Sequence, residues 1–172
     1  MDFLDLAKAR YSVRSFEKRP IEEDVMGKIL EAGRVAPTAK NNQPQQIYIL
    51  KSQEALAKIN ALCRCIFGAP VVLLVCYDEK RAWKNPLVPG YDSGEMDSSI
   101  VCTHMMMEAW ELGVGSCWVG YFNHQAVAEA FGLPAGVKPA ALLPMGYPAK
   151  DAAPSPKFHP VSRPLEEMVE VL

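Results

Sequence analysis

The segment Glu95 to Leu112 is long enough for about five turns of helix and is apolar on nearly every side. Its apolar residues do not form one stripe; they are Met96, Ile100, Val101, Met105, Met106, Met107, Ala109, Trp110 and Leu112. A helix that is apolar nearly all round is buried, either at the centre of a domain or in an interface between subunits. We therefore expect this helix in one of those two places.

The composition is that of one ordinary soluble domain covering residues 1–172. Of these 172 residues, 49% are hydrophobic and the net charge is −2, so there is enough apolar material for a core. A near-neutral chain without a basic block argues against a partner held by charge, such as nucleic acid or an anionic membrane. The N-terminus has no targeting segment, and glycine, asparagine and glutamine interrupt the longest uncharged run. We expect a cytoplasmic protein without a membrane partner.

Helices and strands interleave along the chain, which indicates an α/β or an α+β class. Periodicity and capping residues predict helices around residues 3–7, at 22–33, at 53–62, at 123–131 and over the final run Leu165 to Leu172. Strands are predicted at 47–50, 71–76 and 140–145. Between Asp78 and Gly94 the pattern fails, and we interpret this stretch as a loop or lid.

The first candidate site has the spacing Arg-x-Ser-x-Arg. If this segment is extended, the side chains of Arg10, Ser12 and Arg14 project to the same side. Two guanidiniums and a hydroxyl would then form a receptor for a phosphate monoester through charge-assisted hydrogen bonds. Taken alone, a solvated basic turn explains the same residues better.

The second candidate is the polar loop from Pro37 to Pro44. Asparagine and glutamine side chains offer both donors and acceptors, which suits a heterocycle with alternating N–H, N and C=O groups. An ordinary connection between a helix and a strand uses the same residue types. The loop composition does not separate the two interpretations.

The third candidate is the glycine-rich run from Gly113 to Phe122. Its glycine spacing is not a dinucleotide fingerprint, and no P-loop lysine follows, but glycine allows a flat ligand to approach the backbone closely. Cys117 could act as a nucleophile with a histidine base, although a buried thiol is the better interpretation. The isolated histidines and the absence of a Cys-x-x-Cys pair predict that no metal is bound.

The order of these blocks resembles the nitroreductase family of FMN-dependent oxidoreductases. The matching blocks are RYSVRSF at 10–16, APTAKNNQPQ at 36–45, ELGVGSCWVGYF at 111–122, and GYP at 146–148 with SRPLEEMV at 162–169. They extend over nearly the whole chain. The resemblance implies an α+β fold, with a mostly antiparallel sheet flanked by helices, and an intertwined homodimer that binds FMN at its interface.

The resemblance also implies roles for individual residues. Contacts to the FMN phosphate and ribityl chain would come from Arg10, Tyr11, Ser12, Arg14 and the C-terminal Arg163. Asn41 and Gln43 would lie beside the flavin, while Pro37, Thr38 and Ala39 would come from the other subunit. Val119 and Gly120 would bring a backbone N–H near the flavin N5. Many relatives have a further basic residue where this chain has Val161, and Lys157 is the candidate to replace it.

No catalytic side chain is required by this resemblance, because the cofactor carries the chemistry. Hydride from NAD(P)H would pass through the flavin to a nitroaromatic, a quinone or a similar acceptor in a ping-pong cycle. We expect Trp83, Tyr91 and Phe122 to line or cover the acceptor site, although Trp83 could equally be a local hydrophobic anchor. The alternatives are a specialised flavoenzyme of the same fold and a non-catalytic FMN-binding or storage module.

Proline usage adds an expectation about the C-terminal part. Eight of the 14 prolines lie between Pro134 and Pro164, which predicts a semi-rigid extended arm over about 134–164. Together with the apolar segment 95–112, this arm suggests that one chain is half of a working homodimer.

Overall fold

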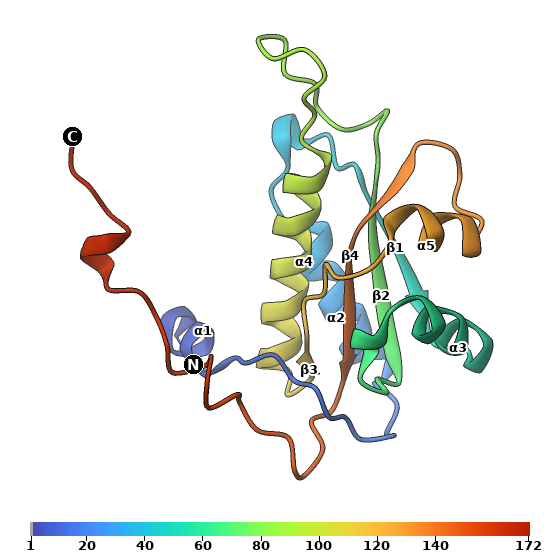
Figure 1. Cartoon of the computed structure of the whole chain (residues 1–172), viewed down its shortest axis with the longest axis vertical. Helices are drawn as coiled ribbons and strands as arrows, with labels where there is room; N and C mark the ends of the chain where they lie inside the picture. The colour runs from blue at the N-terminus through green and yellow to red at the C-terminus, as the bar shows by residue number, and fades with distance from the viewer. Residues whose placement is uncertain (1) are drawn as a thin grey trace.

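The computed structural model describes residues 2–172 and is built around a four-stranded sheet (Figure 1). The strands are β1 (Gln45–Leu50), β2 (Val71–Asp78), β3 (Gly115–Ser116) and β4 (Val137–Gly146), in the order β1-β2-β4-β3. Every neighbouring pair is antiparallel. This arrangement confirms the α+β class and the three expected strands. The short strand β3, within the glycine-rich run, was not expected from the sequence.

Helices cover both faces of the sheet (Figure 1). They are α2 (Glu23–Arg34), α3 (Gln53–Leu62), α4 (Gly94–Glu111) and α5 (His124–Ala130), whereas α1 (Phe3–Ala9) contacts α4 and has no buried residue. Side chains of α2 and α4 pack on one face, and those of α3 and α5 pack on the other. Ser52 and Asn123 cap α3 and α5 with side-chain oxygens that accept backbone N–H bonds of 3.1 and 3.0 Å.

Strand β2 is buried on both faces, which explains why its sequence VVLLVC does not alternate. Val71, Leu73 and Val75 belong to the core cluster under α2 and α4. Val72, Leu74 and Cys76 belong to the cluster under α3 and α5. The sheet therefore separates two cores, and β2 contributes to each.

Helix α4 is buried along one side only. Val101, Cys102, Met105 and Ala109 are fully buried against the sheet and α2. A Cβ on Gly33 of α2 would lie 2.7 Å from the Cγ of Met105, so this glycine allows the two helices to pack closely. On the opposite side Met96 is 58% exposed, and Thr103 and His104 are exposed. Central packing thus accounts for only part of this helix's apolar surface.

The C-terminal part differs from the expected helix. Instead of a helical run from Leu165 to Leu172, there is a single 3-10 turn, Leu165–Glu167, in an exposed tail. A short segment that packs on nothing lacks the tertiary contacts that stabilise most helices. The prolines Pro139 and Pro144 lie within β4, so the extended part of the chain begins after Gly146. The tail then runs past α1 and away from the sheet (Figure 1).

Candidate functional site

The segment Arg10 to Arg14 is extended and borders a cavity of about 220 Å³ near the C-terminal end of α4. Val13 is fully buried, and its N–H donates to the carbonyl of Ser116 in β3 (3.0 Å). Because extended side chains alternate, Ser12 and Arg14 project away from the Val13 side. Arg10, Ser12 and Arg14, which we call the arginine cradle, all line the cavity.

Glycine allows the cradle segment to lie directly on β3. A Cβ on Gly115 would come within 2.5 Å of the Cγ2 of Val13. Any larger residue at this position would push the segment outward. Gly115 therefore allows the Val13 side chain to pack closely on β3, while the approach of a flat ligand to the glycine-rich run stays a prediction.

The cradle carries two positive charges without counterions. Within residues 2–172, neither Arg10 nor Arg14 forms a salt bridge to a carboxylate. The guanidinium of Arg14 donates to the Ser12 carbonyl (3.2 Å) and lies 5.9 Å from the centre of the Phe67 ring. Two unpaired guanidiniums beside a hydroxyl can bind an anionic group such as a phosphate.

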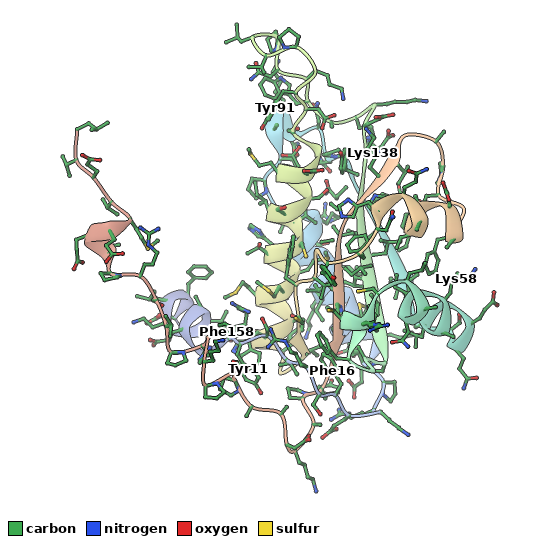
Figure 2. The ribbon with its side chains drawn as sticks, viewed as in Figure 1. Tyr11, Phe16, Lys58, Tyr91, Lys138 and Phe158 are labelled. Carbon is green, nitrogen blue, oxygen red and sulfur yellow. The ribbon has the colours of Figure 1, made fainter. Side chains whose placement is uncertain are left out.

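Residues from the extended C-terminal part complete the cavity wall. Ser155, Phe158 and His159 line it, and the Tyr11 hydroxyl donates to the carbonyl of Ala152 (3.3 Å). The Tyr11 ring meets those of Trp110 and His159 edge to face, at centroid distances of 5.1 and 6.1 Å. Figure 2 shows Tyr11 and Phe158 near each other below α4. Sequence reasoning missed these wall residues, since proline spacing indicates an extended chain but not what it contacts.

The polar loop 37–43 lies at the other end of α4. The N–H of Ala39 donates to the carboxylate of Asp97, in the first turn of that helix (2.9 Å). Asp97 and Trp110, which packs on Tyr11, are thirteen residues apart, or about 20 Å along a helix axis. Within one chain, the loop and the arginine cradle are therefore too far apart to hold the same small ligand.

The backbone of this loop is constrained. Lys40, Asn41 and Gln43 all have positive φ angles, of 52°, 54° and 49°. The side chain of Gln43 donates to that of Asn41 (3.2 Å), and the N–H of Gln43 donates to the hydroxyl of Thr38 (3.1 Å). Non-glycine residues in this left-handed region are uncommon and persist only where surrounding contacts hold them.

Two of the expected acceptor-site residues lie near the polar loop. Trp83 and Tyr91 belong to the connection between β2 and α4, and the N–H of Trp83 donates to the hydroxyl of Ser93 (3.1 Å). Tyr91 is 38% exposed and lies at the opposite end of α4 from Tyr11 (Figure 2). Phe122 instead packs on the core under α3 and α5, with its ring 4.4 Å from that of His124. One chain does not bring the three aromatic residues together.

Val119 and Gly120 differ in the availability of their backbone N–H groups. The N–H of Val119 donates to the carbonyl of Leu142 (2.9 Å), and the reverse bond is also made. No hydrogen bond from the Gly120 N–H to another part of residues 2–172 is found. Gly120 is exposed, so it is the one of the two that can donate to a ligand.

Arg163 lies in the exposed tail and does not line the cradle of its own chain. Its guanidinium donates to the carbonyl of Glu167 (2.7 Å) and lies 3.5 Å from the carboxylate of the same residue. Lys157 is also exposed, with its ammonium 5.3 Å from the centre of the Phe158 ring. Val161 is 71% exposed.

The thiols of Cys76, Cys102 and Cys117 are unsuited to nucleophilic chemistry. Burial raises the pKa of the Cys117 thiol, although the nearby charges of Arg14 and Arg10 partly oppose this effect. Burial also raises the pKa of Cys76 and of Cys102 to about 12.

Residues 2–172 contain no group of three or more histidine, cysteine or acidic side chains that could hold a metal ion. None of the helices in this part of the chain is long and apolar enough to cross a membrane.

Comparison with known proteins gives one consistent result. The family model described as "Nitroreductase family" matches residues 7–67 and 63–147. A nitroreductase family protein from Clostridium difficile has 40% sequence identity and a TM-score of 0.90, over 99% of this chain and 98% of that one. A Bacillus subtilis protein named FMN reductase [NAD(P)H] is 30% identical over 86% of this chain and 66% of its own length.

A further structure, from Exiguobacterium sibiricum and in complex with FMN, shares the fold. Its TM-score is 0.85 at 23% identity, over 100% of this chain and 98% of that one. The family model covers well over half of the chain, and the antiparallel sheet with its two helical layers recurs in these structures. The chain belongs to the nitroreductase family.

Proposed function

We propose that this protein is an FMN-dependent oxidoreductase that takes hydride from NAD(P)H and reduces nitroaromatic, quinone or similar acceptors. The observation that carries the proposal is the arginine cradle, where Arg10 and Arg14 lie beside Ser12 without a counterion. An anionic ligand would compensate these two charges. The name of the Bacillus subtilis relative, FMN reductase [NAD(P)H], supports FMN as that ligand and NAD(P)H as the reductant.

The residues of the site fit the different parts of FMN. Arg10, Ser12 and Arg14 would hold the phosphate through charge-assisted hydrogen bonds. Tyr11, held by Trp110 and Ala152, keeps the cradle segment in place at the end of α4. The exposed N–H of Gly120 would donate to the flavin ring. When bound, FMN supplies the two-electron carrier that links NAD(P)H to the acceptor.

A homodimer would complete the site. The polar loop with Thr38, Asn41 and Gln43 lies about 20 Å from the cradle along α4, so a partner's loop is the one that could reach it. We propose that Pro37 to Ala39 and Arg163 likewise contact the FMN that is bound by the cradle of the partner subunit. The same homodimer would bring Trp83 and Tyr91 of one subunit near Phe122 of the other.

Exposed apolar surface supports such a dimer. A groove of about 290 Å³ between α1, α2 and α4 is lined by Phe3, Leu6, Ala32, Thr103, His104, Met107, Glu108 and Glu111. Phe3 is 73% exposed and Leu4 is 61% exposed, and α1 has no buried residue. The tail adds further exposed apolar side chains, including Leu165 and Met168. Surface of this kind is typical of a protein interface.

Reductant and acceptor would use the same pocket in turn, which predicts ping-pong kinetics. Anaerobic addition of NADH or NADPH tests the proposal directly, since the purified protein should be yellow and the reductant should bleach it. A colourless protein that cannot be reconstituted with FMN would overturn the proposal. A yellow protein that neither nicotinamide bleaches would instead be an FMN-binding or storage module. Re-oxidation by a nitroarene or a quinone then identifies the acceptor class.

A further inference from the structure

We infer that a pocket beside Gly120 selects planar aromatic acceptors that carry an anionic group, and that Arg64 recognises this group. The inference deepens the proposed function and rests on it, because it names the substrate class of the same site. The pocket has a volume of about 570 Å³ and lies between the end of α3 and the last residues of the glycine-rich run, just before α5.

Two parts of the chain form its walls. Ala61, Leu62, Cys63 and Arg64 come from the end of α3 and the 3-10 turn that follows it. Tyr121, Phe122 and Asn123 come from the segment between Val119 and α5. The thiol of Cys63 donates to the carbonyl of Tyr121 (3.4 Å), so the walls are joined at their base.

The aromatic side chains favour a flat ligand. Tyr121 is 84% exposed, whereas the neighbouring Phe122 packs on the core under α3 and α5. An exposed ring next to an anchored one offers a surface on which a planar group can stack. Tyr121 and Phe122 are the first and second residues after Gly120, whose free N–H is the proposed flavin donor. A ligand in this pocket would thus lie beside the reacting end of the cofactor.

Arg64 gives the pocket its charge preference. It is the only charged residue among those lining the pocket. It is exposed and forms no ion pair with a carboxylate elsewhere in residues 2–172. A planar guanidinium at the rim can bind a carboxylate or a sulfonate in bidentate fashion. Acceptors with such a group should therefore bind better than neutral ones of the same shape.

The test compares the binding of 4-nitrobenzoate with that of 4-nitrobenzamide, its neutral counterpart of similar size. Calorimetry on the full-length protein, incubated with FMN and without reductant, should show the anion binding about fivefold more tightly, as expected for an exposed ion pair. Higher salt should reduce this preference because it screens the charge. Arg64→Gln should abolish the preference and leave binding of the amide unchanged, while Arg64→Lys should keep part of it.

Lys58→Gln is the matched control, since it removes a positive charge from α3 outside the pocket and should keep the preference. Figure 2 shows Lys58 on the side of that helix that faces α5, with its ammonium 5.4 Å from the centre of the Phe131 ring. Equal binding of the two ligands, failure of both to bind, or a preference that survives Arg64→Gln would overturn the inference. Because no reductant is present, these results are independent of the bleaching experiment that tests the proposed function.

Discussion

The backbone N–H of Ala39 donates to the carboxylate of Asp97, 58 residues further along the chain (2.9 Å). The other oxygen of this carboxylate accepts from the hydroxyl of Ser93 (2.7 Å), which itself accepts from the N–H of Trp83. Asp97 is only 2% exposed. One buried side chain therefore connects the polar loop 37–43 to the connection that carries Trp83.

We predict that Asp97→Asn destabilises the protein by about 2 kcal/mol, because an amide has one acceptor oxygen for two donors and leaves one buried donor unpaired. Denaturant unfolding monitored by circular dichroism measures this change. Ser93→Ala should lower the free energy of unfolding by less, because the hydrogen bond from the Ala39 N–H to the Asp97 carboxylate remains. A variant Asp97→Asn as stable as the wild type would show that the two bonds do not hold these loops.

We predict that Arg14→Ala weakens FMN binding about tenfold or more and leaves the fold intact. The loss corresponds to roughly 1.5–3 kcal/mol for a hydrogen bond to a charged group. Quenching of flavin fluorescence measures the affinity, and the melting temperature reports on folding. Lys51→Ala, at an exposed position after β1, is the control and should bind FMN normally. Unchanged affinity of Arg14→Ala would remove this residue from the phosphate site.

We predict that the protein in solution has twice the 19.0 kDa mass of one chain. Met107→Glu should dissociate it, because a carboxylate would enter a groove that already contains Glu108 and Glu111. Light scattering coupled to size exclusion gives the mass, and the absorbance of the eluted protein gives the bound flavin. Gln53→Glu, exposed on α3, should remain dimeric. A wild-type monomer that retains FMN would contradict the shared site.

We predict that Glu22 titrates far below an ordinary glutamate. The Tyr147 hydroxyl and the Arg19 guanidinium both donate to its carboxylate and lower its pKa from 4.5 to about 2. The pair with Tyr147 thus stabilises the fold above pH 4.5, and this contribution is lost as the pH falls towards 2. NMR of the carboxyl carbon measures the pKa. Tyr147→Phe should raise it, whereas Tyr91→Phe should not.

Local patterns were sufficient for most of the fold. The double-sided burial of β2 follows from its unbroken apolar run, and α3 and α5 begin at the capping residues Ser52 and Asn123. The alternation around Val13 also predicts that Ser12 and Arg14 share a side. The predicted helix from Leu165 to Leu172 was wrong because the exposed tail has no surface for this segment to pack on.

Long-range contacts were not predictable in the same way. The bond from Tyr11 to Ala152 joins residues 141 positions apart, and no local pattern at Phe158 or His159 marks them as cavity residues. Trp83 and Phe122 were predicted, together with Tyr91, to line or cover the same acceptor site. The structure separates them, because Phe122 packs on the core under α3 and α5, whereas Trp83 lies in the connection between β2 and α4, and sequence spacing does not report this separation.

The position of the cradle and of the polar loop at opposite ends of α4 has a genetic consequence for the proposed dimer. A chain with Arg14→Ala and a chain with Asn41→Ala would each form a homodimer with two damaged sites. When the two chains pair with each other, both substitutions fall in one site and the second site is assembled entirely from wild-type residues. Co-expression of the two chains should therefore give one intact flavin site in every mixed dimer, which is about one quarter of all sites when the chains pair at random. A site confined to one chain cannot give this form of complementation.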